Sequence, residues 1–326
     1  MDDKESSFFL KQKLICLDII AKGGYATVFY VFHTQYRTYF ALKKVPECQF
    51  EESELQCLIG IDDQKIVNLY KYFKFNGSIY LLMEYCPDDL ENYIKNHPVV
   101  SEAVIYKHIQ GVITSIKACH DRNIAHRDIK PSNFLIDKYD RIKISDFGLS
   151  RKFDANSTCK DNNGTPLFMA PEIIQQKEHN PMQSDVWALG ITIYFLVTGD
   201  FPFYSNSKDQ LNYIIERGEY SSQKITDPLI KHIISRCLTI DATKRPTVDQ
   251  ILEMPYFTCR DIPRARTLST KHDPILKPRV ANCAQRDSFL MQQSIINKVK
   301  SFSKLRKARC KSTDVVLNDT FILADN

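Results

Sequence analysis

The first third of the chain has the polar and apolar pattern of a small antiparallel sheet. Residues 14–45 are rich in Ile, Val, Phe, Tyr and Thr and are broken at Gly23-Gly24 and near Tyr36, which predicts a three-stranded meander. Apolar runs at 66–75 and 78–85 then flank Asn76-Gly77, a strong hairpin signal. Between these two regions we expect a short helix, and its side chains would include Glu51, Glu54, Leu55 and Leu58.

Beyond Pro87 the apolar period changes from two residues to about 3.6 residues, the period of an α-helix. Ser101 is a plausible N-cap for a helix whose buried face would hold Ile105, Ile109, Val112 or Ile113, Ile116 and Cys119. Apart from a hairpin around residues 141–147, the rest up to Phe257 predicts helices. We therefore expect an α+β fold with a lobe boundary near Pro87, and the cleft between such lobes is a favoured ligand site.

Composition narrows the class of protein. The chain has 326 residues, 43% of them hydrophobic, which suffices for a sizeable core. The longest apolar segment, Val186 to Gly199, is too short to cross a bilayer and predicts a buried helix. The first residues lack a secretory signal pattern, so we expect an intracellular protein, cytoplasmic or nuclear. Ten cysteines without a C-x-x-C pair indicate reduced thiols, with no disulfide framework or zinc site.

Positive charge is concentrated after Thr258. From there to the end the chain carries fourteen Lys and Arg against six Asp and Glu, whereas the preceding part has a small negative net charge. Within a predicted tail at 259–326, an amphipathic helix at about 286–310 would align Met291, Ile295, Val299 and Phe302. Such a helix could dock on the protein itself, bind calmodulin or lie on an anionic membrane, and a disordered tail is the alternative. Nucleic-acid binding is not expected, because no aromatic residues are interleaved with the charges.

An ordered set of motifs follows the predicted strands and helices. They are FALK (Phe40 to Lys43), HRDIKPSN (His126 to Asn133), SDFG (Ser145 to Gly148), GTPLFMAPE (Gly164 to Glu172), DVWALG (Asp185 to Gly190) and KRPT (Lys244 to Thr247). In this order the motifs resemble those of the eukaryotic protein kinase superfamily. The resemblance covers residues 12–258 and implies a two-lobed fold, with a β-rich N-lobe at about 12–85 and a helical C-lobe at about 86–258.

The resemblance implies a catalytic set for phosphoryl transfer, in which the protein supplies charge neutralisation and alignment. Lys43 would hold the α- and β-phosphates, and Glu54 would pair with it; Glu51 and Glu52 are alternative partners. Asp128 would accept or orient the proton of the attacking hydroxyl, and Lys130 would neutralise the γ-phosphate during transfer.

The resemblance also implies the cofactors, namely ATP with Mg²⁺, or Mn²⁺ as a substitute. Asn133 and Asp146 would bind the metal through hard oxygen ligands. The nucleotide would contact residues from both lobes: Val28, Ala41, Met83, Glu84, Cys86, Asp89 and Leu135. Among them Cys86 is a thiol near the cleft, although a small apolar hinge residue is the preferred interpretation.

The loop Ala21-Lys22-Gly23-Gly24-Tyr25-Ala26 takes the place of the family's glycine-rich loop. The central glycine is kept, but Ala21 and Ala26 stand where the family has glycine. Alanine removes no backbone N–H, so the loop can still hold phosphate. Because alanine restricts the backbone, we expect a stiffer loop and weaker ATP binding.

Lys130 and Thr165 resemble the Ser/Thr-specific branch, so the expected function is transfer of phosphate to protein Ser or Thr hydroxyls. A pseudokinase, with this fold but without turnover, is the alternative, and the altered glycine loop favours it. A kinase for a small metabolite would lack the GTPLFMAPE segment, which is present. The short turn at GDFPF favours a calmodulin-dependent-kinase-like subgroup.

Arg127 next to Asp128 implies a negative charge on the segment from Asp146 to Glu172. Asp161 already supplies one charge at the position where related kinases often carry a phosphorylated residue, although it is also interpretable as a solvated loop charge. We expect basal activity without phosphorylation, with Ser157 or Thr158 as an optional site for an upstream kinase.

Other matches have architectural rather than catalytic roles in this family. Asp185 would brace the catalytic loop, and Glu172 would pair with Arg245 inside the helical lobe. A packed column linking the lobes would consist of Leu58, Leu69, His126 and Phe147.

Overall fold

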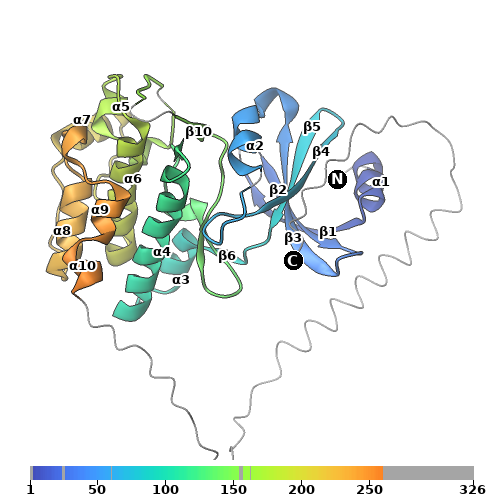
Figure 1. Cartoon of the computed structure of the whole chain (residues 1–326), viewed down its shortest axis with the longest axis horizontal. Coiled ribbons are helices and arrows are strands. Elements are labelled where there is room, and N and C mark those ends of the chain that lie inside the picture. Colours follow the sequence, from blue (N-terminus) through green and yellow to red (C-terminus); the bar gives the residue numbers. More distant parts are fainter. Residues whose placement is uncertain (1–2, 24–25, 60, 154–156, 162, 260–326) are drawn as a thin grey trace, which may run out of the picture. The chain divides into compact units, whose positions relative to one another are not determined.

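The computed structural model describes residues 3–23, 26–59, 61–153, 157–161 and 163–259. Strands dominate the part up to Glu84, and helices dominate the part that follows (Figure 1). This is the α+β class expected from the change of period near Pro87. The tail predicted at 259–326, with its helix at 286–310, lies outside the described residues except for Cys259.

The N-lobe is built on a five-stranded antiparallel sheet in the order β1-β2-β3-β5-β4. Its strands are β1 (Leu14–Lys22), β2 (Thr27–His33), β3 (Thr38–Pro46), β4 (Leu69–Phe75) and β5 (Ser78–Glu84). The predicted meander is confirmed as β1 to β3. The predicted hairpin is confirmed as β4 and β5, because Asn76 (φ 47°) and Gly77 (φ 67°) both have the positive φ of a type I′ turn.

Two helices accompany this sheet. The predicted short helix is α2 (Glu52–Leu58), which follows a 3₁₀ turn, η1 (Glu47–Gln49). Glu51, which was expected within it, is instead its N-cap residue, with an extended backbone. The other helix, α1 (Asp3–Lys11), precedes β1 and was not predicted from the sequence. In Figure 1 the sheet lies between α1 and α2. Alternate residues of each strand point to opposite faces of the sheet.

The C-lobe is mainly helical. Its helices are α3 (Leu90–Asn96), α4 (Glu102–His120), α5 (Pro171–Ile174), α6 (Pro181–Thr198), α7 (Lys208–Arg217), α8 (Pro228–Cys237), α9 (Val248–Leu252) and α10 (Pro255–Thr258), with 3₁₀ turns η2 (Pro131–Asn133), η3 (Pro166–Phe168) and η4 (Ala242–Lys244). Its short strands are β6 (Asp88–Asp89), β7 (Ile124–Ala125), β8 (Phe134–Ile136), β9 (Ile142–Ile144) and β10 (Arg151–Lys152). Apart from one hairpin, now β8 and β9, only helices were expected in this lobe. That expectation was wrong for β6, β7 and β10, because a strand of two residues is too short to produce a periodic pattern in the sequence.

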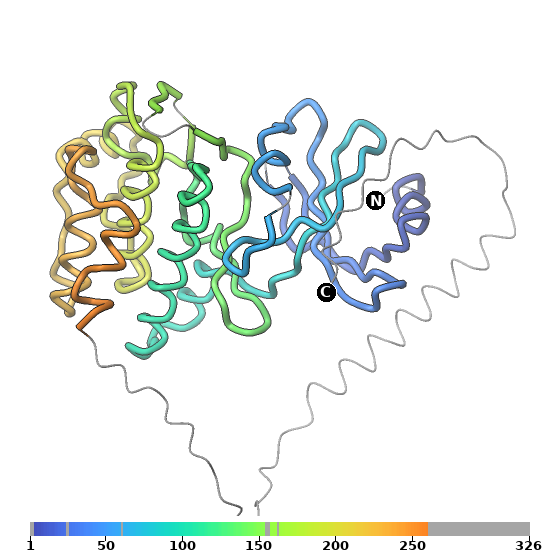
Figure 2. Tube along the Cα trace, viewed as in Figure 1, coloured from blue at the N-terminus to red at the C-terminus, as the bar shows by residue number. Residues whose placement is uncertain are grey.

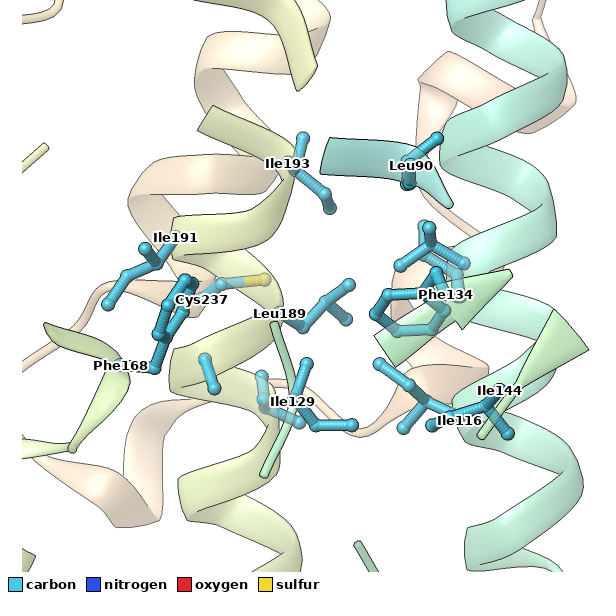
Figure 3. Packing of buried hydrophobic residues seen from close by; sticks show 14 of the residues in the cluster. Leu90, Ile116, Ile129, Phe134, Ile144, Phe168, Leu189, Ile191, Ile193 and Cys237 are labelled. Atoms are coloured by element: carbon cyan, nitrogen blue, oxygen red, sulfur yellow. The ribbon is translucent and has the colours of Figure 1, made fainter. Parts of the chain in front are cut away.

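Helices α4 and α6 form the centre of the C-lobe core. Ser101 caps α4 as predicted, its Oγ accepting a hydrogen bond from the Val104 amide. The predicted buried helix is α6, which ends at Gly199 in the left-handed conformation typical of a C-cap. A Cβ atom at Gly190 would come within 2.7 Å of Cys237 Cβ, so glycine is required where α6 passes α8. Figure 3 shows Leu189 of α6 directed toward Phe134 in this core.

The two lobes are joined by chain connections and by paired backbone. Ile66, which precedes β4, bridges to Ile144 of β9. Lys143 of β9 is buried and donates to Glu84 Oε2 at 2.8 Å at the end of β5 (Figure 2 traces both segments). Burying this charge is tolerable because it is paired. The contacts bring β9, and with it the SDFG segment, beside the sheet of the N-lobe.

The thiol and membrane expectations can be compared with the described residues. The eight cysteines among them are all free, as expected for reduced thiols. Within the described part of the chain, no helix combines the length and apolarity that a membrane span requires.

Candidate active site

Lys43 of β3 lies between two carboxylates, one from each lobe. Its Nζ atom is 2.6 Å from Glu54 Oε1 of α2 and 2.8 Å from Asp146 Oδ1 of the SDFG segment. Glu54 is therefore the partner of Lys43, as predicted, rather than Glu51 or Glu52. The three charges join the sheet, the helix and the C-lobe at one point.

The pKa values of Lys43 and Asp146 keep both of these groups charged. Burial opposes the charge on Lys43, but Asp146 and Glu54 outweigh it and raise the lysine pKa above its ordinary value. Desolvation likewise opposes ionisation of Asp146, yet Lys43 holds the pKa of this carboxyl below its ordinary value. At neutral pH the site thus offers an ammonium group and an ionised carboxylate that remains partly exposed.

Asp128 is the centre of a second network, in the loop after β7. Its Oδ2 accepts from Lys130 Nζ at 2.7 Å and from Asn133 Nδ2 at 3.0 Å. Its Oδ1 accepts from the hydroxyl of Thr165 at 2.7 Å, and Lys130 also donates to that hydroxyl. Asp128 thus accepts a hydrogen bond from an alkyl hydroxyl through Oδ1, while Lys130 contacts that hydroxyl and the other carboxylate oxygen.

Backbone geometry in the loop that carries Asp128 is held by a buried carboxylate. Arg127 (φ 67°) and Asp146 (φ 61°) both lie in the left-handed region, which is unfavourable for residues with a side chain. Asp185 of α6 accepts from the amides of His126 and Arg127, each at 2.8 Å, and this contact braces the loop as predicted. Strain at Arg127 is therefore held by a group from the helical core.

His126 is buried and packs against Phe147 with ring centroids 5.0 Å apart. Its Nε2 atom donates to the Ser145 carbonyl at 2.9 Å. Leu58 and Phe147 are also buried, and Leu69 packs beside the same core cluster. The ring contact between His126 and Phe147 confirms this part of the predicted column, and Leu58 and Leu69 lie in or beside the same core cluster. His126 therefore has a packing position rather than an acid or base position.

The residues predicted to contact the nucleotide come from both lobes. Val28 and Ala41 lie in β2 and β3, and Ala41 is in register with the buried Met83 of β5. On the C-lobe side, Leu135 of β8 is in register with Asp89 of β6. The Asp89 carboxylate also caps α3 by accepting from the Asn92 amide at 2.9 Å. These placements leave the nucleotide contacts as predictions.

Cys86 follows β5 in the segment that joins the lobes. Burial, with a smaller contribution from Glu84, raises the pKa of its thiol to about 12. A thiol that stays protonated near neutral pH is a poor nucleophile. This favours the interpretation of Cys86 as a small apolar residue.

The loop between β1 and β2 is a tight hairpin in its described part. Ala21 pairs with Val28 and Lys22 with Thr27, and the Gly23 amide donates to the Ala26 carbonyl at 2.9 Å. Ala21 thus lies within a β-strand, a conformation that alanine adopts readily. Gly24 and Tyr25, also predicted to contact phosphate, lie outside the described residues.

The segment between Asp146 and Glu172 is anchored at several points. Asp161 Oδ2 accepts from Arg127 Nη2 at 2.8 Å and from Arg151 at 3.4 Å.

The backbones of Cys159 and His179 donate hydrogen bonds to each other, which ties the segment to the residues just before α6. The Thr158 hydroxyl donates to Glu178. A pocket at this point is lined by Arg127, Asp161 and Asp128, among others.

Two features of the site were missed in the sequence. One is the Lys143–Glu84 ion pair, for which the only signal was a lysine between two isoleucines of a buried strand. The other is the Thr165 hydroxyl contact with Asp128, because Thr165 was interpreted only as a mark of Ser/Thr specificity. Both contacts join segments far apart in the sequence.

Comparisons with known proteins agree with this geometry. Residues 15–257 match the protein kinase domain family. The chain is 32% identical over 208 residues to a probable serine/threonine-protein kinase, MARK-A, of Dictyostelium discoideum, covering 64% of this chain and 20% of that protein. It is 28% identical over 316 residues to sperm motility kinase 1 of Mus musculus, covering 93% of this chain and 65% of that protein. It is 30% identical over 254 residues to sperm motility kinase 3A of Mus musculus, covering 76% of this chain and 50% of that protein. The chain spans from a fifth to about two thirds of the length of these relatives.

Proposed function

Because the chain belongs to the protein kinase family, we propose that it transfers the γ-phosphoryl group of ATP to Ser or Thr hydroxyls of proteins. The observation that carries this proposal is the Asp128 network, in which a threonine hydroxyl already donates to the carboxylate at 2.7 Å. A substrate hydroxyl that displaced Thr165 would meet the same acceptor.

The proposal gives each charged residue one role. Lys43, held by Glu54, presents its ammonium group to the α- and β-phosphates. Asp128 orients the acceptor hydroxyl and takes its proton, while Lys130 neutralises negative charge that develops on the transferred group. Hydrogen bonds already hold Lys43 to Glu54 and Lys130 to Asp128, so the change needed at these side chains is the displacement of the Thr165 hydroxyl.

Asp146 and Asn133 fit the requirements of a magnesium site. Asp146 uses Oδ1 for Lys43, so its second oxygen is available. Asn133 donates from Nδ2 to the Asp128 carbonyl and carboxylate, which leaves its amide oxygen as a ligand. One carboxylate and one amide are hard ligands that suit Mg²⁺, or Mn²⁺ in its place, when phosphates and water complete the shell. A bound ion would supply positive charge that offsets the negative charge of the phosphates.

The relatives support Ser and Thr as acceptors, since MARK-A carries the name of a serine/threonine-protein kinase. The acceptor is identified by incubating the full chain with Mg-ATP and peptide pools in which only Ser, only Thr or only Tyr is present. Phosphate in the Ser or Thr pools supports the proposal. Phosphate confined to the Tyr pool would contradict it.

We also propose that the protein acts inside the cell and that Asp161 provides basal activity without phosphorylation. An upstream kinase could act at Ser157, whereas a phosphate on Thr158 would lie beside the Glu178 carboxylate and be repelled by it. Protein substrates are expected. Calmodulin, anionic membranes and the lobes themselves are candidate partners of the basic tail.

A further inference from the structure

Helix α1 precedes the matched kinase domain and packs on the N-lobe sheet. Phe9 is 1% exposed and contacts Phe29 of β2 and Tyr80 of β5 with its ring. Phe8 stacks on Phe75 of β4 with ring centroids 4.2 Å apart. The helix thus contacts three strands through aromatic rings and is linked to a fourth, β1, by a short turn.

These contacts are on one face of the sheet only. The core cluster around Phe9 contains Phe40 and Leu42 of β3 together with Tyr80 and Leu82 of β5. Residues of opposite parity, including Leu81 and Met83, belong to the other core cluster. Lys43 has the parity of Ala41 and reaches Glu54 of α2. Helix α1 therefore covers the face opposite to the one that presents Lys43.

Glu5 makes a polar contact between α1 and this face. Its carboxylate is buried, accepting from Lys44 Nζ at 2.8 Å and from the Tyr80 hydroxyl at 2.7 Å. Lys44 and Tyr80 are directly opposite each other in β3 and β5. A buried carboxylate is costly unless paired, so Glu5 favours one register and spacing of these two strands.

The strand pair that Glu5 connects is adjacent to the catalytic lysine. Lys43 and Leu81, the next pair of the ladder, point to the other face. Glu5 thus contacts Lys44 of β3 on one face of the sheet. On the other face, Glu54 and Asp146 contact the preceding residue, Lys43. A change in the distance between β3 and β5 would move the Lys43 side chain relative to a bound nucleotide.

We propose that α1 is a positioning element of the nucleotide site, and that Glu5 couples it to the strand that carries Lys43. This inference rests on the proposed function only in assuming that the nucleotide binds beside Lys43. Glu5 is a positioning residue, because it contacts Lys44 and Tyr80 rather than the substrate.

The test compares Glu5→Ala and Glu5→Gln with Asp3→Ala in the full chain. Asp3 is an exposed acidic residue in the same helix, so its variant controls for the loss of one carboxylate. Affinity for a fluorescent ATP analogue with Mg²⁺ is measured well below the melting temperature of each variant. KM for ATP and kcat are measured in parallel.

We expect Glu5→Ala to weaken analogue binding and raise KM for ATP by about three- to tenfold, because small misplacements of a binding group are costly. The kcat should change less. Glu5→Gln should lie between wild type and alanine, since its amide oxygen still accepts from Tyr80. Asp3→Ala should match wild type. If Glu5→Ala lowers the melting temperature but leaves affinity and KM unchanged, α1 only stabilises the fold and the inference is wrong.

Measuring binding of the ATP analogue separately from phosphate transfer distinguishes a failure of this inference from a failure of the proposed function. A wild-type chain that binds the analogue but transfers no phosphate contradicts the function, while the effect of Glu5 on binding still supports the inference. A wild-type chain that binds no analogue would contradict both.

Discussion

Arg127 and Asp161 form an ion pair, with Nη2 2.8 Å from Oδ2. The arginine side chain is 6% exposed and precedes Asp128 directly, whereas the aspartate lies 34 positions further along the chain. Since Arg151 also reaches the same oxygen, two positive charges converge on one carboxylate. The pair links the catalytic loop to the segment that supplies Thr165.

Removal of this carboxylate tests whether it supports activity without phosphorylation. We expect phosphatase-treated wild type to be active and Asp161→Asn to lower kcat/KM by about tenfold, the scale of one partly exposed charge-assisted hydrogen bond. Lys160→Ala, at an exposed neighbouring position, is the control. Peptide phosphorylation assays with intact mass spectrometry measure both quantities. Loss of all activity after phosphatase treatment, or an unchanged Asp161→Asn, would contradict the account.

Lys43 is expected to act in transfer through its charge. Lys43→Met keeps most of the side-chain volume but leaves Glu54 and Asp146 without their shared cation. We expect kcat/KM to fall at least about a hundredfold, as when a charge-stabilising donor is removed from an active site. Lys74→Met, in an exposed ion pair of β4, is the matched control and should retain activity. Comparable activity of the two variants in steady-state assays would rule out this role.

The Glu172–Arg245 pair predicts a pH dependence of stability. Burial would raise the pKa of Glu172, but Arg245, at 2.7 Å, outweighs it and lowers the pKa. A lowered folded-state pKa stabilises the protein above the ordinary carboxyl pKa of about 4.3, and this contribution is lost as pH falls through the folded-state value. Glu172→Gln should therefore cost about 3–5 kcal/mol in the free energy of unfolding at pH 7.

Urea unfolding of wild type and Glu172→Gln checks this prediction. The difference in the free energy of unfolding between the two proteins should shrink as the pH is lowered below about 4, because the carboxylate of wild-type Glu172 then becomes neutral as well. Glu216→Gln, at an exposed position of α7, should show little difference at either pH. A constant difference for Glu172→Gln across this range would be inconsistent with the lowered pKa.

Much of the site could be predicted because its residues lie in contiguous motifs. The motif HRDIKPSN contains Asp128, Lys130 and Asn133 within eight positions. This local spacing allows Lys130 and Asn133 to donate to the Asp128 carboxylate. Glu54 was also predicted correctly as the ion-pair partner of Lys43, because of the three glutamates considered it is Glu54 that contacts Lys43. Strands β1 to β5 were predicted because turn residues separate their apolar runs.

Helix α1 shows why the remainder could not be predicted. Its nine residues include one buried carboxylate and one fully buried ring, too few to establish a period. The contact of Glu5 with Tyr80 spans 75 positions, and a sequence pattern does not indicate which distant strand a short helix will cover. Tertiary contacts, rather than helix propensity, account for its position.

Cys86 is expected to react slowly with alkylating reagents. Its thiol pKa is raised to about 12, mainly by burial, so little thiolate is present at pH 7.5. Cys48 is exposed and serves as the internal comparison. Peptide mass spectrometry after brief iodoacetamide treatment of the native protein should show modified Cys48 and intact Cys86. Equal labelling rates would contradict the raised pKa.

The central claim, that this fold turns over rather than serving as a scaffold, is tested most directly with Asp128→Asn. Transfer of labelled γ-phosphate from Mg-ATP to a mixed peptide pool is measured for the wild type and the variant, with nucleotide affinity measured in parallel. The account predicts transfer to Ser or Thr by wild type, a loss of about a hundredfold to ten-thousandfold in the variant, and unchanged affinity. Nucleotide binding without transfer by wild type, or equal transfer by both proteins, would contradict it.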